Sequence, residues 1–162
     1  MKAALLGASA LLAIGISGCL SRSEPAQEPI EDDSAVPALE WHTDFDAVLE
    51  RAAREQRPIL ANFTGSDWCR WCILLDNQVF EKPEFQRYAQ ENLILFMADF
   101  PQKKAVPESV AAQNRALAER YGVRGFPTIL LLDAKGQALA QTGYRKGGAE
   151  AYVQHLKELL SE

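Results

Sequence analysis

The feature that most restricts the possible fold is a buried strand followed at once by a turn and two closely spaced cysteines. After Pro58, Ile59–Phe63 is a short, continuous apolar run, which is typical of a buried strand. Glycine, serine and aspartate at positions 65–67 predict a turn, and a helix is expected to begin near Cys69. Cys69 and Cys72 would then lie three positions apart on one helical face, where their sulfurs can close a disulfide. The fold must therefore bring the end of a strand to the start of a helix.

Residues 41–162 alternate between helical and extended patterns, as expected for a single α/β domain. Thr43 is predicted to cap a first helix, and Pro83 is expected to be the first residue of a later one. Two strands separated by a helical crossover should pair in parallel, and the turn Asp133–Gly136 predicts an antiparallel hairpin. The later strands are predicted at Leu93–Ala98, Thr128–Leu132 and Ala138–Thr142, and further helices at 45–53, 110–121 and 152–160. The expected architecture is a mixed sheet with helices on both faces.

The segment before Cys19 is not expected to belong to the fold. Lys2 precedes an apolar stretch of small and aliphatic residues, which has the pattern of an export signal and is short for a membrane span. Residues 1–18 are therefore predicted to be a signal peptide. Ile16–Cys19 resembles the lipobox of bacterial lipoproteins, in which the signal is cut before the cysteine and the cysteine is acylated. An uncleaved anchor, or a simple secretory signal with an unrelated Cys19, are the alternatives.

Residues 19–40 are predicted to be the lipid-bearing cysteine and a disordered acidic tether. From Leu20 to Glu40 there are six acidic residues and one basic residue, with three prolines and few large apolar groups. Such a composition buries too little surface to offset the entropy lost on ordering. The remainder of the chain is nearly neutral and lacks the basic excess that nucleic acid requires. We therefore expect a membrane contact through the N-terminal lipid and no nucleic-acid partner.

The three cysteines of the chain are an odd number, and acylation of Cys19 would leave Cys69 and Cys72 as a self-contained pair. At a helix start, Cys69 would meet free backbone N–H groups and the positive end of the helix dipole, which favour its nucleophilic thiolate. Arg70 adds a positive charge nearby. Cys72, one turn further on, would be more buried and would resolve a mixed disulfide formed by Cys69. The pattern predicts thiol–disulfide exchange that needs no cofactor.

The cysteine pair also admits interpretations without thiol–disulfide exchange. Zinc normally takes four ligands, and the chain has no second cysteine pair. His42 and His155 are far apart in sequence and are interpreted as non-catalytic, so no metal site is predicted. A purely structural disulfide across so short a loop would remove little entropy from the unfolded chain. Two unreactive core cysteines, or delivery of a soft metal such as Cu(I) through the two thiols, are also possible interpretations.

Residues 63–72, with the sequence FTGSDWCRWC, resemble the active-site stretch of the thioredoxin superfamily. They are most similar to bacterial exported thioredoxin-like proteins with a Trp-Cys-x-Trp-Cys motif, and more distantly to the C-terminal domain of DsbD-type thiol:disulfide interchange proteins. Tyr121–Thr128 is similar to a second family segment, whose proline is cis and lies beside the sulfurs. The resemblance implies a thioredoxin-like three-layer α/β/α sandwich with a mixed sheet. It also implies a cis bond at Pro127 and a free Phe126 backbone that can bond an extended substrate.

One position departs from the superfamily pattern. Thioredoxins bury an acidic residue beneath the cysteines, on the strand before the active site, to accept a proton from the resolving thiol. Asn62 stands at the matching position, and an amide cannot act as a base at neutral pH. Asp67 and Asp76 are candidate replacements, although each is also typical of a turn or of a helix surface.

The two tryptophans of the motif are expected to form its exposed surface. Trp68 is expected to shield Cys69 and to contact substrate, and Trp71 to widen the same surface. The structural alternative is that either ring only packs against the loop that carries Pro127. Arg70 and Trp71, the dipeptide between the cysteines, do not indicate the direction of electron flow.

These features predict a thiol–disulfide oxidoreductase that acts on disulfides or thiols of exported proteins. The expected location is the periplasm-facing cell envelope, with a membrane redox partner, and Leu20 after Cys19 favours the outer membrane by analogy with lipoprotein sorting. The alternative from a different functional class is a tethered binding module or holdase in which the Cys69–Cys72 pair stays oxidised.

Overall fold

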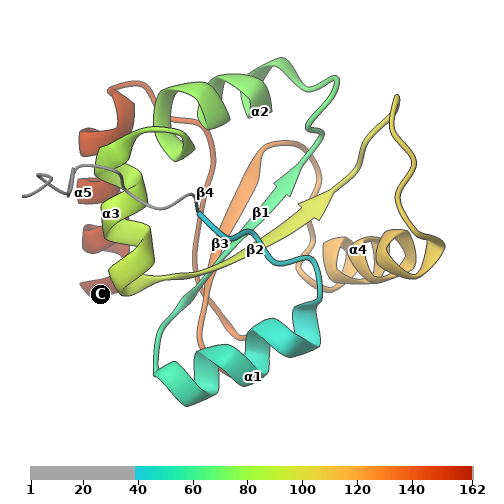
Figure 1. Ribbon diagram of the computed structural model, residues 1–162, viewed down its shortest axis with the longest axis horizontal. Coiled ribbons are helices and arrows are strands. Elements are labelled where there is room, and N and C mark those ends of the chain that lie inside the picture. Colours follow the sequence, from blue (N-terminus) through green and yellow to red (C-terminus); the bar gives the residue numbers. More distant parts are fainter. Residues whose placement is uncertain (1–38, 162) are drawn as a thin grey trace, which may run out of the picture. The chain divides into compact units, whose positions relative to one another are not determined.

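The computed structural model describes residues 39–161, which form a four-stranded sheet with helices on both faces (Figure 1). The strand order is β2-β1-β3-β4, in which β1 pairs in parallel with β2 and antiparallel with β3, and β3 pairs antiparallel with β4. The strands are β1 (Ile59–Thr64), β2 (Ile94–Asp99), β3 (Thr128–Leu132) and β4 (Ala138–Thr142). The helices are α1 (Phe45–Glu55), α2 (Arg70–Leu75), the π-helical turn η1 (Asp76–Phe80), α3 (Pro83–Asn92), α4 (Glu108–Arg120) and α5 (Gly148–Ser161). The predicted signal peptide, Cys19 and nearly all of the predicted tether lie outside the described residues.

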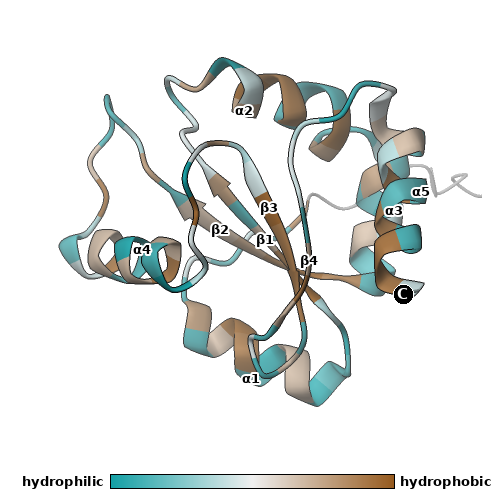
Figure 2. Ribbon diagram, turned by 180° about the vertical axis from the view of Figure 1, so that it is seen from behind, coloured by the Kyte–Doolittle hydropathy of each residue, from teal (hydrophilic) through white to brown (hydrophobic). Residues whose placement is uncertain are grey.

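Alternation along β1 divides the core into two layers, since successive side chains of a strand point to opposite faces. Leu60 packs with residues of η1, α3 and α5, whereas Ile59, Ala61 and Phe63 pack with α1 and α4. All six residues of β1 are buried, which is expected for a central strand covered on both faces. Figure 2 shows largely apolar strands between helices in which hydrophilic and hydrophobic residues alternate. The predicted three-layer α/β/α sandwich with a mixed sheet is therefore confirmed.

The predicted hairpin and the parallel pair are also confirmed, with β3 and β4 at the predicted residues. The helix cap predicted at Thr43 is wrong by one residue. The side chain of Asp44 accepts a hydrogen bond from the backbone N–H of Ala47 and caps α1, while the Thr43 carbonyl accepts one from Gln113 Nε2. Both residue types are good caps, and Gln113 of α4 bonds the backbone on either side of Asp44.

The helix after the cysteines differs from the single α-helix that the sequence predicts. It continues from α2 into η1, where the N–H of Glu81 donates to the carbonyl of Asp76, five residues earlier. The wider turn places the adjacent residues Val79 and Phe80 both in the core. Insertions of this kind occur frequently at functional sites. The shift in helical phase begins after Asp76, whose own backbone N–H still donates to the carbonyl of Cys72, four residues earlier.

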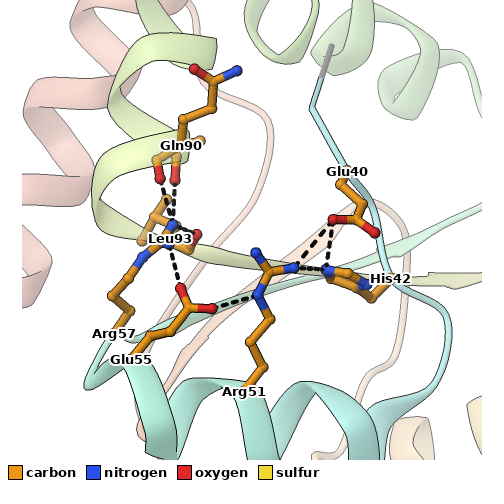
Figure 3. A network of polar contacts seen from close by, with 8 residues as sticks. Glu40, His42, Arg51, Glu55, Arg57, Gln90 and Leu93 are labelled. Carbon is orange, nitrogen blue, oxygen red and sulfur yellow. Dashed lines mark hydrogen bonds and ion pairs between the residues drawn. The ribbon is translucent and has the colours of Figure 1, made fainter. Parts of the chain in front are cut away.

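An arginine-centred network joins the start of the described chain to α1 and α3 (Figure 3). Arg57 Nη2 donates to the carbonyls of Ala89, Gln90 and Leu93, which caps the end of α3. Arg51 Nε donates to Glu55 at 2.7 Å, and Arg51 Nη1 lies 2.7 Å from His42 Nε2 and 3.2 Å from Glu40. His42 is thus held in a structural network. Within residues 39–161, no helix is long and apolar enough to cross a membrane.

Candidate active site

Cys69 and Cys72 lie at the start of α2 and form a disulfide. Cys69 is the N-cap residue, and its Sγ accepts the backbone N–H of Cys72 at 3.3 Å. The positive end of the helix therefore faces this sulfur. Cys69 is 6% exposed and Cys72 1% exposed, so Cys69 is the sulfur that a substrate can reach. The predicted helix-start position and the predicted difference in burial are both confirmed.

The turn before the cysteines is fastened to the segment that follows β2. Ser66 donates to Asp99 through its backbone N–H at 3.0 Å and its hydroxyl at 2.6 Å. The Trp68 indole N–H donates to the carbonyl of Phe100 at 2.8 Å. Gly65 is required here, because a Cβ at this position would lie 2.5 Å from the Trp68 ring. The turn and the start of the loop after β2 therefore form one rigid unit beside Cys69.

Asp67 completes this attachment. Its carboxylate accepts the backbone N–H groups of Gln102, Lys103 and Lys104 at 2.9, 2.7 and 3.0 Å. Although desolvation opposes the change, these three N–H groups and the charge of Lys104 lower the pKa of Asp67. A carboxylate with a lowered pKa and filled acceptor positions is a poor base. Of the two candidate acids, Asp67 therefore holds the loop after β2 in place and is unsuited to accept a proton.

The Phe126–Pro127 peptide bond is cis, as the resemblance implies. The Phe126 ring meets Trp68 edge-on at 6.0 Å between centroids and stacks on Phe100 at 4.9 Å. Trp68 thus packs against the loop that carries Pro127 and is also exposed to solvent. Both interpretations of Trp68, as a packing residue and as a contact surface, are compatible with this position.

An open groove of about 390 Å³ lies beside the cis proline. It is lined by Trp71, Phe126, Pro127, Tyr144 and Lys146. Trp71 is 50% exposed and its ring lies 5.2 Å from that of Tyr144. The Tyr144 hydroxyl donates to Gln78 Oε1 at 2.8 Å, which fixes the ring at the groove wall. The groove is largely aromatic and continuous with the motif between the cysteines.

Two of the groove residues, Tyr144 and Lys146, are absent from the sequence-based prediction. They lie between β4 and α5, in a segment with no motif of its own, and only the fold brings them to Trp71. Arg70 lies over the Trp71 ring, with its guanidinium carbon 5.8 Å from the ring centroid. Arg70 therefore contacts the groove wall.

The position beneath the cysteine pair is occupied by Asn62, which is buried on β1. Asp76 begins η1, four residues after Cys72. Burial raises the pKa of Asp76 to about 6, with smaller contributions from the negative charges of Glu81 and Asp99. Of the two candidate acids, Asp76 is thus the one whose pKa approaches that of a thiol.

His155 lies on α5 and contacts β4. Its Nε2 lies 3.0 Å from Thr142 Oγ1, and burial lowers its pKa, with a further contribution from Arg145. In residues 39–161, no three His, Cys, Asp or Glu side chains are grouped so that they could hold a metal ion.

Residues 45–159 match the family of the thioredoxin-like domain. Disulfide bond reductase DsbH of Chlamydia pneumoniae is 37% identical over 144 residues, which cover 88% of this chain and 86% of that protein. The thiol:disulfide interchange protein DsbD of Cronobacter sakazakii is 31% identical over 120 residues, which cover 72% of this chain but only 19% of that protein.

Solved structures agree with this assignment. A structure of DsbH oxidoreductase superposes with a TM-score of 0.76 at 37% identity, covering 85% of this chain and 94% of that one. The oxidised C-terminal domain of DsbD from Neisseria meningitidis superposes with a TM-score of 0.53 at 16% identity, covering 74% of this chain and 98% of the domain. At this low identity, the similarity to the DsbD domain shows a shared fold and nothing about function.

Proposed function

This chain belongs to the thioredoxin-like family, and on that basis we propose that it reduces disulfide bonds of exported proteins through Cys69 and Cys72. The observation that carries the proposal is the cysteine pair at the N-terminus of α2, in which Cys69 is the N-cap and the more exposed of the two residues. A reducing direction is supported by the likeness to a relative whose name is disulfide bond reductase and which aligns over most of both chains.

The proposed reaction uses the two sulfurs in sequence. The Cys69 thiolate, favoured by the helix N-terminus and by the Cys72 N–H, attacks a substrate disulfide and displaces one substrate sulfur as a thiolate. Cys72 then loses its proton and attacks Cys69 Sγ, which closes the Cys69–Cys72 disulfide and releases the second substrate sulfur. Two electrons pass to the substrate, and both of its sulfurs leave as thiols after taking up protons.

The direction is tested by the reduction potential of the pair, measured by equilibration with glutathione or dithiothreitol buffers. We expect a value between about −300 and −200 mV, the range of reducing dithiols, and catalytic reduction of a peptide disulfide when dithiothreitol supplies electrons. A variant with serine at both Cys69 and Cys72 is the control and should be inactive. A potential above about −150 mV would assign the protein an oxidising role.

The aromatic groove is the proposed binding surface for the polypeptide that carries the disulfide. Phe126 precedes the cis proline and offers its backbone to an extended segment, while Trp68 and Trp71 provide apolar contact on either side of Cys69. Buried aromatic anchors supply much of the binding energy at protein interfaces.

Trp71→Ala should raise KM for a peptide disulfide about 5- to 10-fold and leave kcat within about twofold, because the ring contacts the polypeptide and not the reacting sulfurs. Hydroxyethyl disulfide is too small to fill the groove, and its reduction should keep the wild-type rate. Leu139→Ala, which truncates an apolar side chain that is 54% exposed and outside the groove, is the matched control. An equal loss with both disulfides would assign Trp71 to the chemistry instead.

The proposal also includes the location. The sequence Ile16–Cys19 supports export and acylation of Cys19, and residues 19–40 would then tether the domain at the periplasmic side of a membrane, with the outer membrane favoured. A reductase in an oxidising compartment needs a continuous supply of electrons, so a membrane redox partner is part of the proposal. Metabolic labelling with palmitate, dependent on Cys19, tests the anchor.

A further inference from the structure

The second step of the proposed reaction requires a base. The identity of this base is inferred below, on the premise of the proposed function. Cys72 must lose a proton before it can attack Cys69 Sγ, since only the thiolate is nucleophilic. An ordinary thiol has a pKa of about 8.5, and burial of Cys72 disfavours its charged form further. Asn62, at the position where the superfamily carries an acid, cannot accept this proton. The proton must therefore go to another group.

Asp76 is placed to receive it. It follows Cys72 by one helical turn, and its backbone N–H donates to the Cys72 carbonyl. Residues four apart on a helix have Cβ atoms about 5–6 Å apart, a separation that a carboxylate, alone or with one water, can span. Its neighbours Leu75 and Val79 are buried in the core, so Asp76 lies at the inner edge of the helix. Within residues 39–161, no lysine or arginine forms an ion pair with its carboxylate.

A cluster of polar groups lies under this helix, in a layer that is otherwise apolar. Asn62 and Thr64 are both on the face of β1 that α2 and η1 cover, and Thr64 is opposite Asp99 in the register of β1 and β2. In the described part of the chain, Asn62 Oδ1 and Thr64 Oγ1 are buried without a hydrogen-bond partner. Buried polar atoms are normally satisfied by protein or by ordered water. These two oxygens, on the face of β1 that the helix covers, are therefore positions at which an ordered water can bind beneath it.

We infer that Asp76 is the proton acceptor for Cys72, in place of the acid that the superfamily carries where this chain has Asn62. When Cys72 attacks, the S–H bond breaks and the proton passes to the Asp76 carboxylate, directly or through one water. The Cys72–Cys69 bond forms as the bond between Cys69 and the substrate sulfur breaks. The departing substrate thiolate takes up a proton, and Asp76 returns its own to water.

The charges around Asp76 suit this role. Burial, with smaller contributions from the negative charges of Glu81 and Asp99, raises its pKa to about 6. At pH 7 about nine carboxyls in ten are then ionised and able to accept a proton. Transfer from a thiol of pKa about 8.5 is unfavourable by about 300-fold, compared with about 50,000-fold for an aspartate of ordinary pKa. Burial of Asp76, with the smaller contributions of Glu81 and Asp99, thereby makes the transfer about 150-fold less unfavourable.

Asp76→Asn tests the inference when the two steps are timed separately. Reduced full-length protein is mixed with glutathione disulfide, quenched with acid at intervals, and the protein–glutathione adduct is followed by mass spectrometry. We expect adduct formation within about twofold of wild type, and resolution of the adduct slowed at least about 30-fold at pH 7, since a positioned base contributes about 100-fold or more. Wild-type resolution should rise through about pH 6 and level off. In Asp76→Asn the resolution rate should keep rising above about pH 8, because the Cys72 thiol itself ionises there. The difference in rate between wild type and variant should therefore narrow.

Three comparisons keep the outcomes distinct. Glu91→Gln removes one charge from the exposed surface of α3 and should match wild type. Asp76→Glu should restore most of the resolution rate. Removal of the negative charge of Asp76 would by itself lower the pKa of the Cys72 thiol and speed resolution of the adduct. Slower resolution in Asp76→Asn would therefore report the loss of the proton acceptor. Wild-type resolution and pH profile in Asp76→Asn would overturn the inference and leave the proposed function intact. Failure of wild-type protein to form any adduct would instead count against the proposed function.

Discussion

Cys72→Ser protein should accumulate mixed disulfides with its substrates, whereas Cys69→Ser protein should accumulate none. Cys69 is the more exposed of the two cysteines and lies at the helix N-terminus, so we expect it to form the intermolecular bond. Without Cys72 there is no neighbouring sulfur to resolve this bond intramolecularly, and we expect its lifetime to increase by at least about 1000-fold. The measurement is the yield of higher-mass species, sensitive to dithiothreitol, after thiol groups are blocked in cells that express each variant.

The double serine variant is the control for disulfides formed through any other cysteine. Equal and negligible trapping by both single variants, together with a very low reduction potential, would contradict an exchange reaction. It would favour a tethered binding module in which the pair stays oxidised. Tight one-to-one binding of Cu(I) by the reduced protein would favour metal delivery.

Replacing Phe80 by alanine should lower the free energy of unfolding by about 3–5 kcal/mol, as expected when a large buried aromatic side chain is truncated. Phe80 ends η1 and is buried among Trp41, Phe85 and Tyr152, with ring centroids at 5.2, 4.8 and 6.2 Å. Urea denaturation followed by circular dichroism measures the change.

The effect of Phe80→Ala should reach the active site as well, because Phe80 anchors the helix that carries both cysteines. Leu139→Ala removes an exposed apolar side chain and should change stability by less than about 0.5 kcal/mol. A loss below about 1 kcal/mol in Phe80→Ala would mean that the surrounding aromatic rings close the cavity, and that η1 is held by its backbone hydrogen bonds alone.

The parts of the fold that local patterns determine could be predicted from the sequence. The strands Thr128–Leu132 and Ala138–Thr142 follow from apolar runs bounded by proline and glycine, and Pro83 begins α3 as expected. The η1 turn could not be predicted in this way. It depends on packing both Val79 and Phe80 into one core, which is a property of the folded chain and not of helix propensity.

The active site shows the same distinction between features set by local motifs and features set by tertiary packing. Cys69, Cys72 and Pro127 lie within short motifs, and the structure brings them to one end of the sheet with Trp68 and Phe126. Tyr144 and Lys146 could not be predicted, because their contribution depends on where the chain turns after β4.

The two candidate acids illustrate what the structure adds to the sequence. The sequence gives no reason to prefer Asp67 or Asp76 as a proton acceptor. Only tertiary hydrogen bonds and burial distinguish the two carboxyls. Asp67 anchors a loop and has a lowered pKa, whereas Asp76 is half-buried and has a raised pKa.

The attachment of the turn at 65–68 to the loop after β2 has a consequence for how such proteins can diversify. Asp67 and Trp68 hold residues 100–104, while residues 105–107 complete the connection to α4. Insertions or deletions at 105–107 would therefore leave the rim of the active site in place. The length of this connection could then change without moving the residues that surround Cys69.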